Sequence, residues 1–170
     1  EEGEKRMQEY FEKKAPNRDK WRRKNRFYNK RIEKHFSFII PEGSTVLELG
    51  CSTGDLLNAV NPKIGIGVDF SPTAIEIARK KYPNLKFYCE DAVNFSYDGK
   101  IDYVIISDLL SSAWDLQALF KQVRKLLSPR TKVIISNYNF IWRPILRTAE
   151  LLGLKEKQPH QNWLSVKDIE

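Results

Sequence analysis

The sequence predicts an α/β fold: a Rossmann-like open, mainly parallel sheet with helices on both faces, preceded by an N-terminal helix. Three observations predict it. Short stretches rich in Val and Ile alternate with amphipathic stretches from residue 45 to residue 136. A loop framed by glycines follows the first of these short stretches. The chain, at 170 residues, is long enough for one domain with a sizeable core. Because right-handed crossovers connect parallel strands, this alternation gives a sheet covered on both sides.

The first element that the spacing predicts is a long helix over residues 18–40. Apolar side chains recur there at steps of three, four and seven, and we expect one buried stripe of Trp21, Tyr28, Ile32, Phe36 and Ile39. Asn17 is placed to cap the start of this helix, and the sequence Pro-Glu-Gly at 41–43 ends it. We therefore expect residues 1–43 to form an N-terminal helical cap segment and residues 44–170 to form the main domain.

Five short stretches are expected to be strands buried on both faces of the sheet. They are residues 45–49, 64–69, 85–89, 101–107 and 132–136. Each is short and apolar on both of its faces, which suits strands of a parallel sheet. If the first of them lies at the centre of the sheet, the loop that follows it is at the position where ligands of such sheets bind.

Helices are predicted between these strands, at residues 55–60, 73–82 and 113–127, and after them near 143–152. Ser71 is expected to cap the second of these helices, with Pro72 in its first turn, and Gly153 to stop the last. The stretch 94–100 is too short and polar for a helix, and we expect a loop there.

The charge is concentrated at the N-terminal end. The whole chain has a formal net charge of +7, and residues 1–34 hold 13 Lys or Arg against 7 Asp or Glu. A basic segment interleaved with aromatic residues suits the phosphates of nucleic acid. The solvated face of an ordinary helix has the same composition, so nucleic-acid binding is the alternative that we do not favour.

Several classes of protein are excluded by composition. No apolar run approaches the roughly 20 residues that a membrane helix needs, so we expect no membrane insertion. Cys51 and Cys89 are the only cysteines, too few for a disulfide framework, which indicates a reducing cytoplasm. His35 and His160 lack cysteine or acidic partners at ligand spacing, so no metal site is expected.

The glycine loop lies in the stretch VLELGCSTGD, residues 46–55. A dinucleotide loop of the form Gly-x-Gly-x-x-Gly would need glycines where this chain has Ser52 and Asp55. The carboxylates of Glu48 and Asp55 flank the loop and would repel a pyrophosphate. The loop therefore suits a nucleoside that carries positive charge and no phosphate. S-adenosylmethionine, with its adenosine, sulfonium and amino-acid parts, is such a molecule.

Four stretches resemble, in their order and spacing, the motif series of class I S-adenosylmethionine-dependent methyltransferases. They are VLELGCSTGDLL, IGVDFSPTAIEIAR, FYCEDAVNF and DYVIISDLL, and the match covers residues 46–138. The resemblance implies an S-adenosylmethionine-binding methyltransferase domain over residues 44–170. The family's sheet ends in an antiparallel hairpin, for which the residues after 136 are too few. We therefore expect a C-terminally incomplete domain of a longer protein, or an exposed strand at 132–136 that a fused or partner domain covers.

The resemblance also implies which residues bind the cofactor. Glu48 matches the acid that faces the methionine ammonium, Asp69 the acid that binds both ribose hydroxyls, and Asp91 the acceptor for the adenine amino group. The chemistry of Asp69 agrees, because a carboxylate accepts from two adjacent hydroxyls. Asp69 and Asp91 have alternative roles, at a helix start and in a turn. The other residues implied to line the cofactor are Gly50, Cys51, Ser52, Gly54, Phe70, Ala92 and Ser107.

Candidates for the acceptor side follow the fourth and fifth predicted strands. Asp108 is a candidate general base, although it precedes an ordinary helix start. Tyr28, with Arg26, is a candidate to close over the methionine end, although Tyr28 also belongs to the apolar stripe. Further candidates are Asn137, Tyr138 and Asn139.

The acceptor is expected to be a small molecule. Amino-methylating enzymes that act on nucleobases or glutamine have an Asn/Asp-Pro-Pro-aromatic signature after the fourth strand, where this chain has SDLL at 107–110. Residues 10–57 and the stretches NYNFIWRPILR and QNWLS resemble a microbial subgroup sometimes joined to a sugar-transferase domain, which implies a glycan or lipid-linked precursor. An RNA methyltransferase and a non-catalytic S-adenosylmethionine-binding module are the alternatives.

Overall fold

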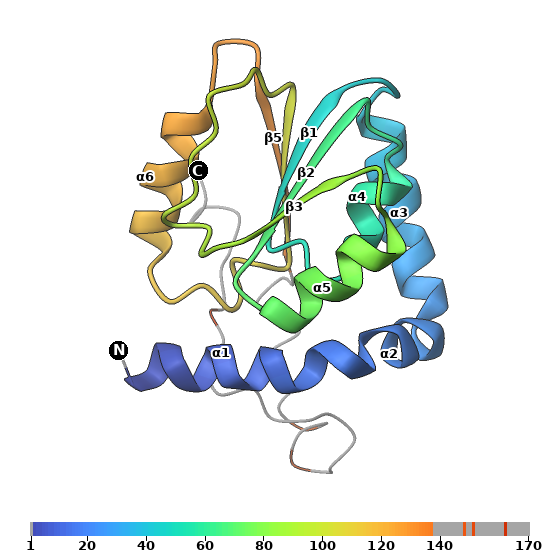
Figure 1. Ribbon diagram of the computed structural model, residues 1–170, viewed down its shortest axis with the longest axis vertical. Helices are drawn as coiled ribbons and strands as arrows, with labels where there is room; N and C mark the ends of the chain where they lie inside the picture. The colour runs from blue at the N-terminus through green and yellow to red at the C-terminus, as the bar shows by residue number, and fades with distance from the viewer. Residues whose placement is uncertain (1, 138–147, 149–150, 152–161, 163–170) are drawn as a thin grey trace.

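Five parallel strands form one open sheet in the computed structural model, which describes residues 2–137, 148, 151 and 162. The order across the sheet is β3-β2-β1-β4-β5, with β1 at the centre (Figure 1). The strands are β1 Thr45–Leu49, β2 Ile64–Asp69, β3 Lys86–Cys89, β4 Tyr103–Ser107 and β5 Lys132–Ser136. The predicted fold class is confirmed, and three of the five strands have the predicted bounds.

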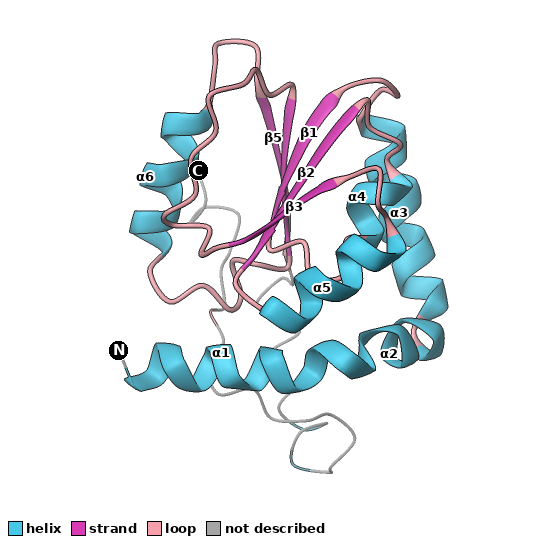
Figure 2. Cartoon of the chain, viewed as in Figure 1, coloured by secondary structure: helices cyan, strands magenta, loops and turns pink. Residues whose placement is uncertain are grey.

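Helices cover both faces of the sheet, α3, α4 and α5 on one and α6 on the other (Figure 2). The helices are α1 Glu2–Lys14, α2 Arg18–Lys24, α3 Arg26–Ile39, α4 Asp55–Ala59, α5 Pro72–Lys81 and α6 Leu116–Leu126, with a 3-10 helix η1 at Ala15–Asn17. The loop expected at 94–100 is confirmed. The helix predicted near 143–152 lies outside the described residues, apart from Thr148 and Leu151, and so does Gly153.

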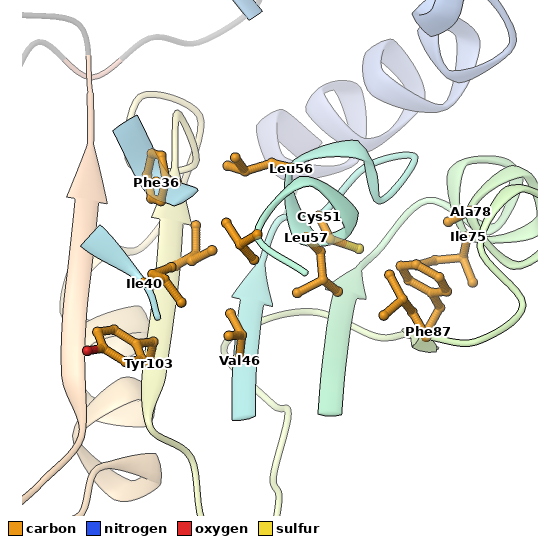
Figure 3. Close-up of a cluster of buried hydrophobic side chains, with 13 residues drawn as sticks. Phe36, Ile40, Val46, Cys51, Leu56, Leu57, Ile75, Ala78, Phe87 and Tyr103 are labelled. Carbon is orange, nitrogen blue, oxygen red and sulfur yellow. The ribbon is translucent and has the colours of Figure 1, made fainter. Parts of the chain in front are cut away.

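Two hydrophobic clusters form the core, one on each face of the sheet. Successive residues of a strand point to opposite faces, so Val46 joins the cluster under α3, α4 and α5, and Leu47 joins the cluster under α6. Figure 3 shows the first cluster, in which Phe36 of α3 and Leu57 of α4 share one layer with Val46 of β1.

The expected burial on both faces is wrong for the two outermost strands. In β3 only Phe87 is buried, and β5 is half-buried along most of its length. Both strands have a single neighbour among the described residues, so one side of each lacks the cover that a neighbouring strand gives. The composition of these stretches does not reveal their place at an edge.

The long helix predicted over 18–40 is two helices, because Asn25 interrupts it. The Asn25 side-chain amide donates to the Trp21 carbonyl at 3.0 Å, a bond that competes with helical pairing. Trp21 and Ile39 are 42% and 49% exposed and do not belong to the buried stripe, which Phe36 shares with Ile40 instead. Asn17 does precede α2, but its side chain makes no capping hydrogen bond.

Helix α1 runs along the edge of the sheet at which the strands end (Figure 1). The Glu12 carboxylate attaches it to the start of α5, where it accepts hydrogen bonds from the Ser71 and Thr73 hydroxyls and from the Thr73 backbone N–H. Ser71 caps α5 as predicted, since its hydroxyl accepts from Ala74 N at 3.1 Å. None of the helices in the described part of the chain is long and apolar enough to span a membrane.

Candidate functional site

The candidate site lies beyond the carboxyl ends of β1 and β4, where the order of the strands reverses. Ligands of open parallel sheets bind at this position. The loop after β1 turns through left-handed conformations at Gly50, Ser52 and Gly54, with φ of 76°, 48° and 75°. Its first N–H groups, from Gly50 and Cys51, donate to the Val68 carbonyl at 2.8 and 3.0 Å. The loop is therefore fixed to the end of β2.

Glu48, near the end of β1, is a buried acid with one unsatisfied oxygen. Its side chain is 3% exposed, and Oε2 has no hydrogen-bond partner among the described residues. Burial raises the pKa of Glu48 to about 8, against a hydrogen bond with the Leu57 backbone that lowers it. An unpartnered buried carboxyl oxygen is costly, and a cation placed beside it would remove the penalty.

Asp69, the last residue of β2, joins the glycine loop to the start of α5. Its Oδ2 accepts from Ser52 N at 2.8 Å, and its Oδ1 accepts from Ser71 N at 3.0 Å. Burial raises the pKa of Asp69, and these two backbone hydrogen bonds oppose that shift. The alternative structural role is therefore present, yet each carboxylate oxygen keeps a lone pair for a second donor.

A charged cavity of about 70 Å³ opens beside Glu48. The predicted residues that line it are Tyr28, Glu48, Gly50, Cys51, Ser52, Ser107 and Asp108. The Tyr28 hydroxyl donates to Asp108 Oδ2 at 3.3 Å, so the two candidate catalytic residues lie together. Burial raises the pKa of Asp108, and the Tyr28 hydrogen bond opposes that shift. Burial also raises the pKa of the Cys51 thiol, which keeps the thiol protonated.

Arg18 is a site residue that the sequence analysis missed. Arg18 is half-buried and lines the charged cavity with Arg22. Burial and the charge of Arg22 lower the pKa of Arg18, and the carboxylates of Asp108, Asp55 and Asp69 oppose this. The available signal was the cluster of acids around the loop, which needs a counter-charge. Arg26, which we expected at this end, is exposed and lines neither cavity described here.

Asp55, which flanks the glycine loop, is neutralised by the protein itself. It accepts from Thr53 Oγ1 at 2.6 Å, Lys81 Nζ at 2.7 Å and the Tyr82 hydroxyl at 2.9 Å, and it lies 3.4 Å from Arg22 Nε. Burial alone would raise the pKa of Asp55, but Lys81 and Thr53 hold it below its usual value. Asp55 is thus an anchor for the loop.

A second, more apolar cavity of about 310 Å³ lies under α1. Phe70, Asp91 and Ala92, which the resemblance implies for the cofactor, line this cavity, with Leu109 and Leu119 on its apolar side. Asp91 Oδ1 accepts from Val93 N at 3.0 Å, which supports the turn role that was the alternative for this residue.

Of the residues that the resemblance implies for the cofactor, Gly54 and Asp69 line neither cavity. A Cβ at Gly54 would lie 2.6 Å from Phe87 Cζ, so packing against β3 and the left-handed backbone explain a glycine here.

The ends of β4 and β5 carry the residues that we expected on the acceptor side. The hydroxyls of Ser107 and Ser136 are hydrogen-bonded at 2.9 Å. Both polar side-chain atoms of Asn137 are buried without a hydrogen-bond partner among the described residues. Tyr138 and Asn139 lie outside those residues. Over residues 2–137, 148, 151 and 162, no group of three or more His, Cys, Asp or Glu side chains is placed to hold a metal ion.

Comparison with known proteins places these features in a family. Residues 40–167 match the family described as "Methyltransferase domain". The chain is 30% identical over 119 residues to Phosphoethanolamine N-methyltransferase 2 of Caenorhabditis elegans, which covers 65% of this chain and 27% of that protein. It is 27% identical over 138 residues to Demethylmenaquinone methyltransferase of Lactococcus lactis, with 75% and 55% covered. The chain therefore spans between about a quarter and three fifths of the length of such curated relatives.

Among solved structures, a possible histamine N-methyltransferase of Thermotoga maritima is similar, with a TM-score of 0.79 and 21% sequence identity. The similarity covers 96% of this chain and 76% of that one. At this level of identity the likeness shows a shared fold.

Proposed function

The chain belongs to the methyltransferase domain family, of the class I S-adenosylmethionine-dependent type, and from this premise we propose that it transfers the methyl group of S-adenosylmethionine to a small-molecule acceptor by in-line displacement. The observation that carries the proposal is the unpartnered Oε2 of Glu48, buried at the end of the central strand beside a cavity. A cationic ligand is what this oxygen lacks.

The residues present fit the cofactor at both of its ends. Glu48 would face the methionine ammonium in the charged cavity. Phe70 and Ala92 would line the adenine in the apolar cavity, and Asp69, between the two ends, would accept from the ribose hydroxyls. The cofactor supplies a methyl group activated by its sulfonium.

This chain's own part in the reaction is to position the acceptor and to move one proton. Holding the reacting groups in line contributes on the order of 7–11 kcal/mol in well-oriented reactions. We assign Asp108 as the general base, with Oδ1 taking the acceptor's proton while Tyr28 donates to Oδ2. Buried Asn137, whose amide has no partner among the described residues, would hold the acceptor.

The acceptor class rests on chemistry and on relatives. The matched relatives are named for phosphoethanolamine and demethylmenaquinone, which are small molecules. For this chain we propose a glycan or lipid-linked precursor, as the sequence resemblance implies. The N-terminal segment 1–43 would act as a cap over the cofactor, and a fused or partner domain would cover β5. The free cysteines suit a reducing cytoplasm.

Isothermal titration calorimetry with S-adenosylmethionine, its demethylated product and NAD tests the cofactor proposal. We expect the first two to bind and NAD not to bind. Asp69→Ala should weaken cofactor binding by about 100-fold or more, since two hydrogen bonds to a charged group contribute about 1.5–3 kcal/mol each. Asp98→Ala, an exposed aspartate in the loop before β4, is the matched control. Equal affinity in wild type and Asp69→Ala would refute the site.

Turnover is tested separately with radiolabelled S-adenosylmethionine and pools of acceptors. We expect label in small molecules, and we expect Asp108→Asn to reduce transfer while cofactor affinity stays the same. Label in RNA instead would favour the RNA methyltransferase alternative. Cofactor binding without transfer to any pool would favour a non-catalytic module.

A further inference from the structure

The outer side of α3 carries two phenylalanines that the core and the site do not use. Phe27 is 78% exposed and Phe38 is 90% exposed. They stand eleven residues apart, which is about three helical turns, so both project from the same side of the helix. The opposite side of α3 buries Asn29 and Phe36 against the protein, which fixes the outward orientation of the two rings.

Cations are dense in α2 and α3, the helix pair that carries these two rings on α3. Residues 18–39 hold nine Lys or Arg and two acidic residues, a net charge of +7 that equals the charge of the whole chain. Both acids are already paired, Asp19 with Lys81 and Glu33 with Arg22. Lys30, Arg31 and Lys34 lie on the same side of α3 as the two rings, all three are exposed, and none forms an ion pair within the described part of the chain.

We propose that this outer side of α3 binds the surface of an anionic lipid bilayer. The two rings would enter the interface between headgroups and acyl chains, and the three cations would face the lipid phosphates. The three cations favour an anionic surface. The two exposed phenylalanine rings favour a surface with an apolar interior that they can enter. Association of this kind is peripheral and needs no spanning segment.

RNA is the competing occupant, and the geometry favours it less. RNA would attract the same cations, but it gains from aromatic faces that lie close enough to stack successive bases. Phe27 and Phe38 are about 16 Å apart along the helix axis, a separation of eleven residues at 1.5 Å each. A helix that lies parallel to a bilayer surface inserts both rings to the same depth, whatever the distance between them.

Co-sedimentation with vesicles tests the proposal without any cofactor or acceptor. We expect binding to vesicles of phosphatidylcholine mixed with phosphatidylglycerol, and little binding to phosphatidylcholine alone. The triple variant Lys30→Glu, Arg31→Glu, Lys34→Glu should lower the partition coefficient by about 100-fold, given about fivefold for each cation near the surface. The double variant Phe27→Ser, Phe38→Ser should lower it by about tenfold. All five side chains are exposed, so circular dichroism should show folded variants.

A matched control separates this surface from the net charge of the protein. Lys121→Glu, Arg124→Glu, Arg130→Glu makes the same change in charge with exposed residues in and after α6, on the other face of the sheet. This control should bind anionic vesicles as wild type does.

Three results would overturn the proposal. Loss of binding in the control triple equal to that in the α3 triple would show that bulk charge alone causes binding. Unchanged binding of the Phe27→Ser, Phe38→Ser variant would exclude contact of the rings with the interface. Binding of a single-stranded RNA, lost in the same α3 variants and with no binding to vesicles, would assign the surface to nucleic acid.

Discussion

The two cavities along the ends of the strands are built on opposite principles. The charged cavity is lined by ionisable groups, the buried Glu48 and the half-buried Arg18 and Asp108, whose pKa values are all shifted by loss of solvent. The apolar cavity, lined by Phe70 and Leu119 among others, depends on shape and contact area. Changes in the first cavity should therefore depend on pH and on ligand charge, and changes in the second should affect all adenosine ligands alike.

The largest expected effect is the pH dependence of stability at Glu48. Its pKa is about 8 in the folded protein and 4.5 in a model peptide, so the folded form resists ionisation and its stability falls as the pH rises from about 4.5 to about 8. Glu48→Gln removes this penalty. Relative to wild type, the variant should gain up to about 5 kcal/mol in the free energy of unfolding between pH 4.5 and pH 9. Urea denaturation across this range measures the difference, and parallel curves would contradict it.

Binding of S-adenosylmethionine should be the next most sensitive property. Glu48→Gln removes the charge that would pair with the ammonium, and we expect affinity to fall by about 10- to 100-fold. In wild type, binding should ionise Glu48 and release a proton near pH 7, which calorimetry in buffers of different ionisation enthalpy detects. The exposed Glu42→Gln is the control. If Glu48→Gln binds S-adenosylmethionine as tightly as wild type, and wild type releases no proton on binding, the charged cavity does not differ from the apolar cavity in the way we describe.

A smaller and uniform effect is expected at the apolar end. Phe70→Ala should weaken binding of S-adenosylmethionine and of its demethylated product by the same factor, about tenfold, because it removes aromatic contact area and no charge. It also removes the edge-to-face contact between Phe70 and Phe11 of α1, whose ring centroids are 6.1 Å apart. Titration of both ligands at two pH values measures the effect. A strong dependence of the Phe70→Ala effect on pH would contradict the contrast between the charged cavity and the apolar cavity.

The smallest effect should be a change in the preference between the two ligands. Arg18→Met keeps an unbranched side chain and removes a half-buried cation that interacts electrostatically with Asp69 and Asp108. The methyl donor carries a sulfonium and its product does not, so the ratio of their dissociation constants should shift about fivefold in favour of the donor. Lys20→Met, an exposed cation in the same helix, is the control. Equal weakening of both ligands would mean that Arg18 acts only through folding.

Local sequence patterns predicted the central part of the fold well. The bounds of β1, β2 and β5 follow from Val- and Ile-rich runs, and the Ser71 cap follows from its place before Pro72. Most residues taken from the motif resemblance line one of the two cavities, because parallel strands end at the same edge of a sheet and bring their following residues together.

The N-terminal contribution to the site could not be predicted in the same way. Glu12 and Ser71 are 59 residues apart, and no periodicity links them. Arg18 lies on a helix that pattern analysis merged with α3, and that merger hid the turn at Asn25. Its burial among acids is a property of the assembled fold, which spacing along one helix does not contain.

The position of β1 at the centre of the sheet has a consequence for the order of assembly during synthesis. Its neighbour β2 follows closely in the chain, whereas its contacts with the start of β4 join residues as far as 57 positions apart, such as Thr45 and Asp102. Pairings between distant residues form slowly, and a chain emerging from the ribosome presents its N-terminal part first. The glycine loop and Asp69 therefore emerge before the β4 wall that carries Ser107 and Asp108. Until β4 is synthesised, the nascent chain has only the part of the charged cavity that the glycine loop forms.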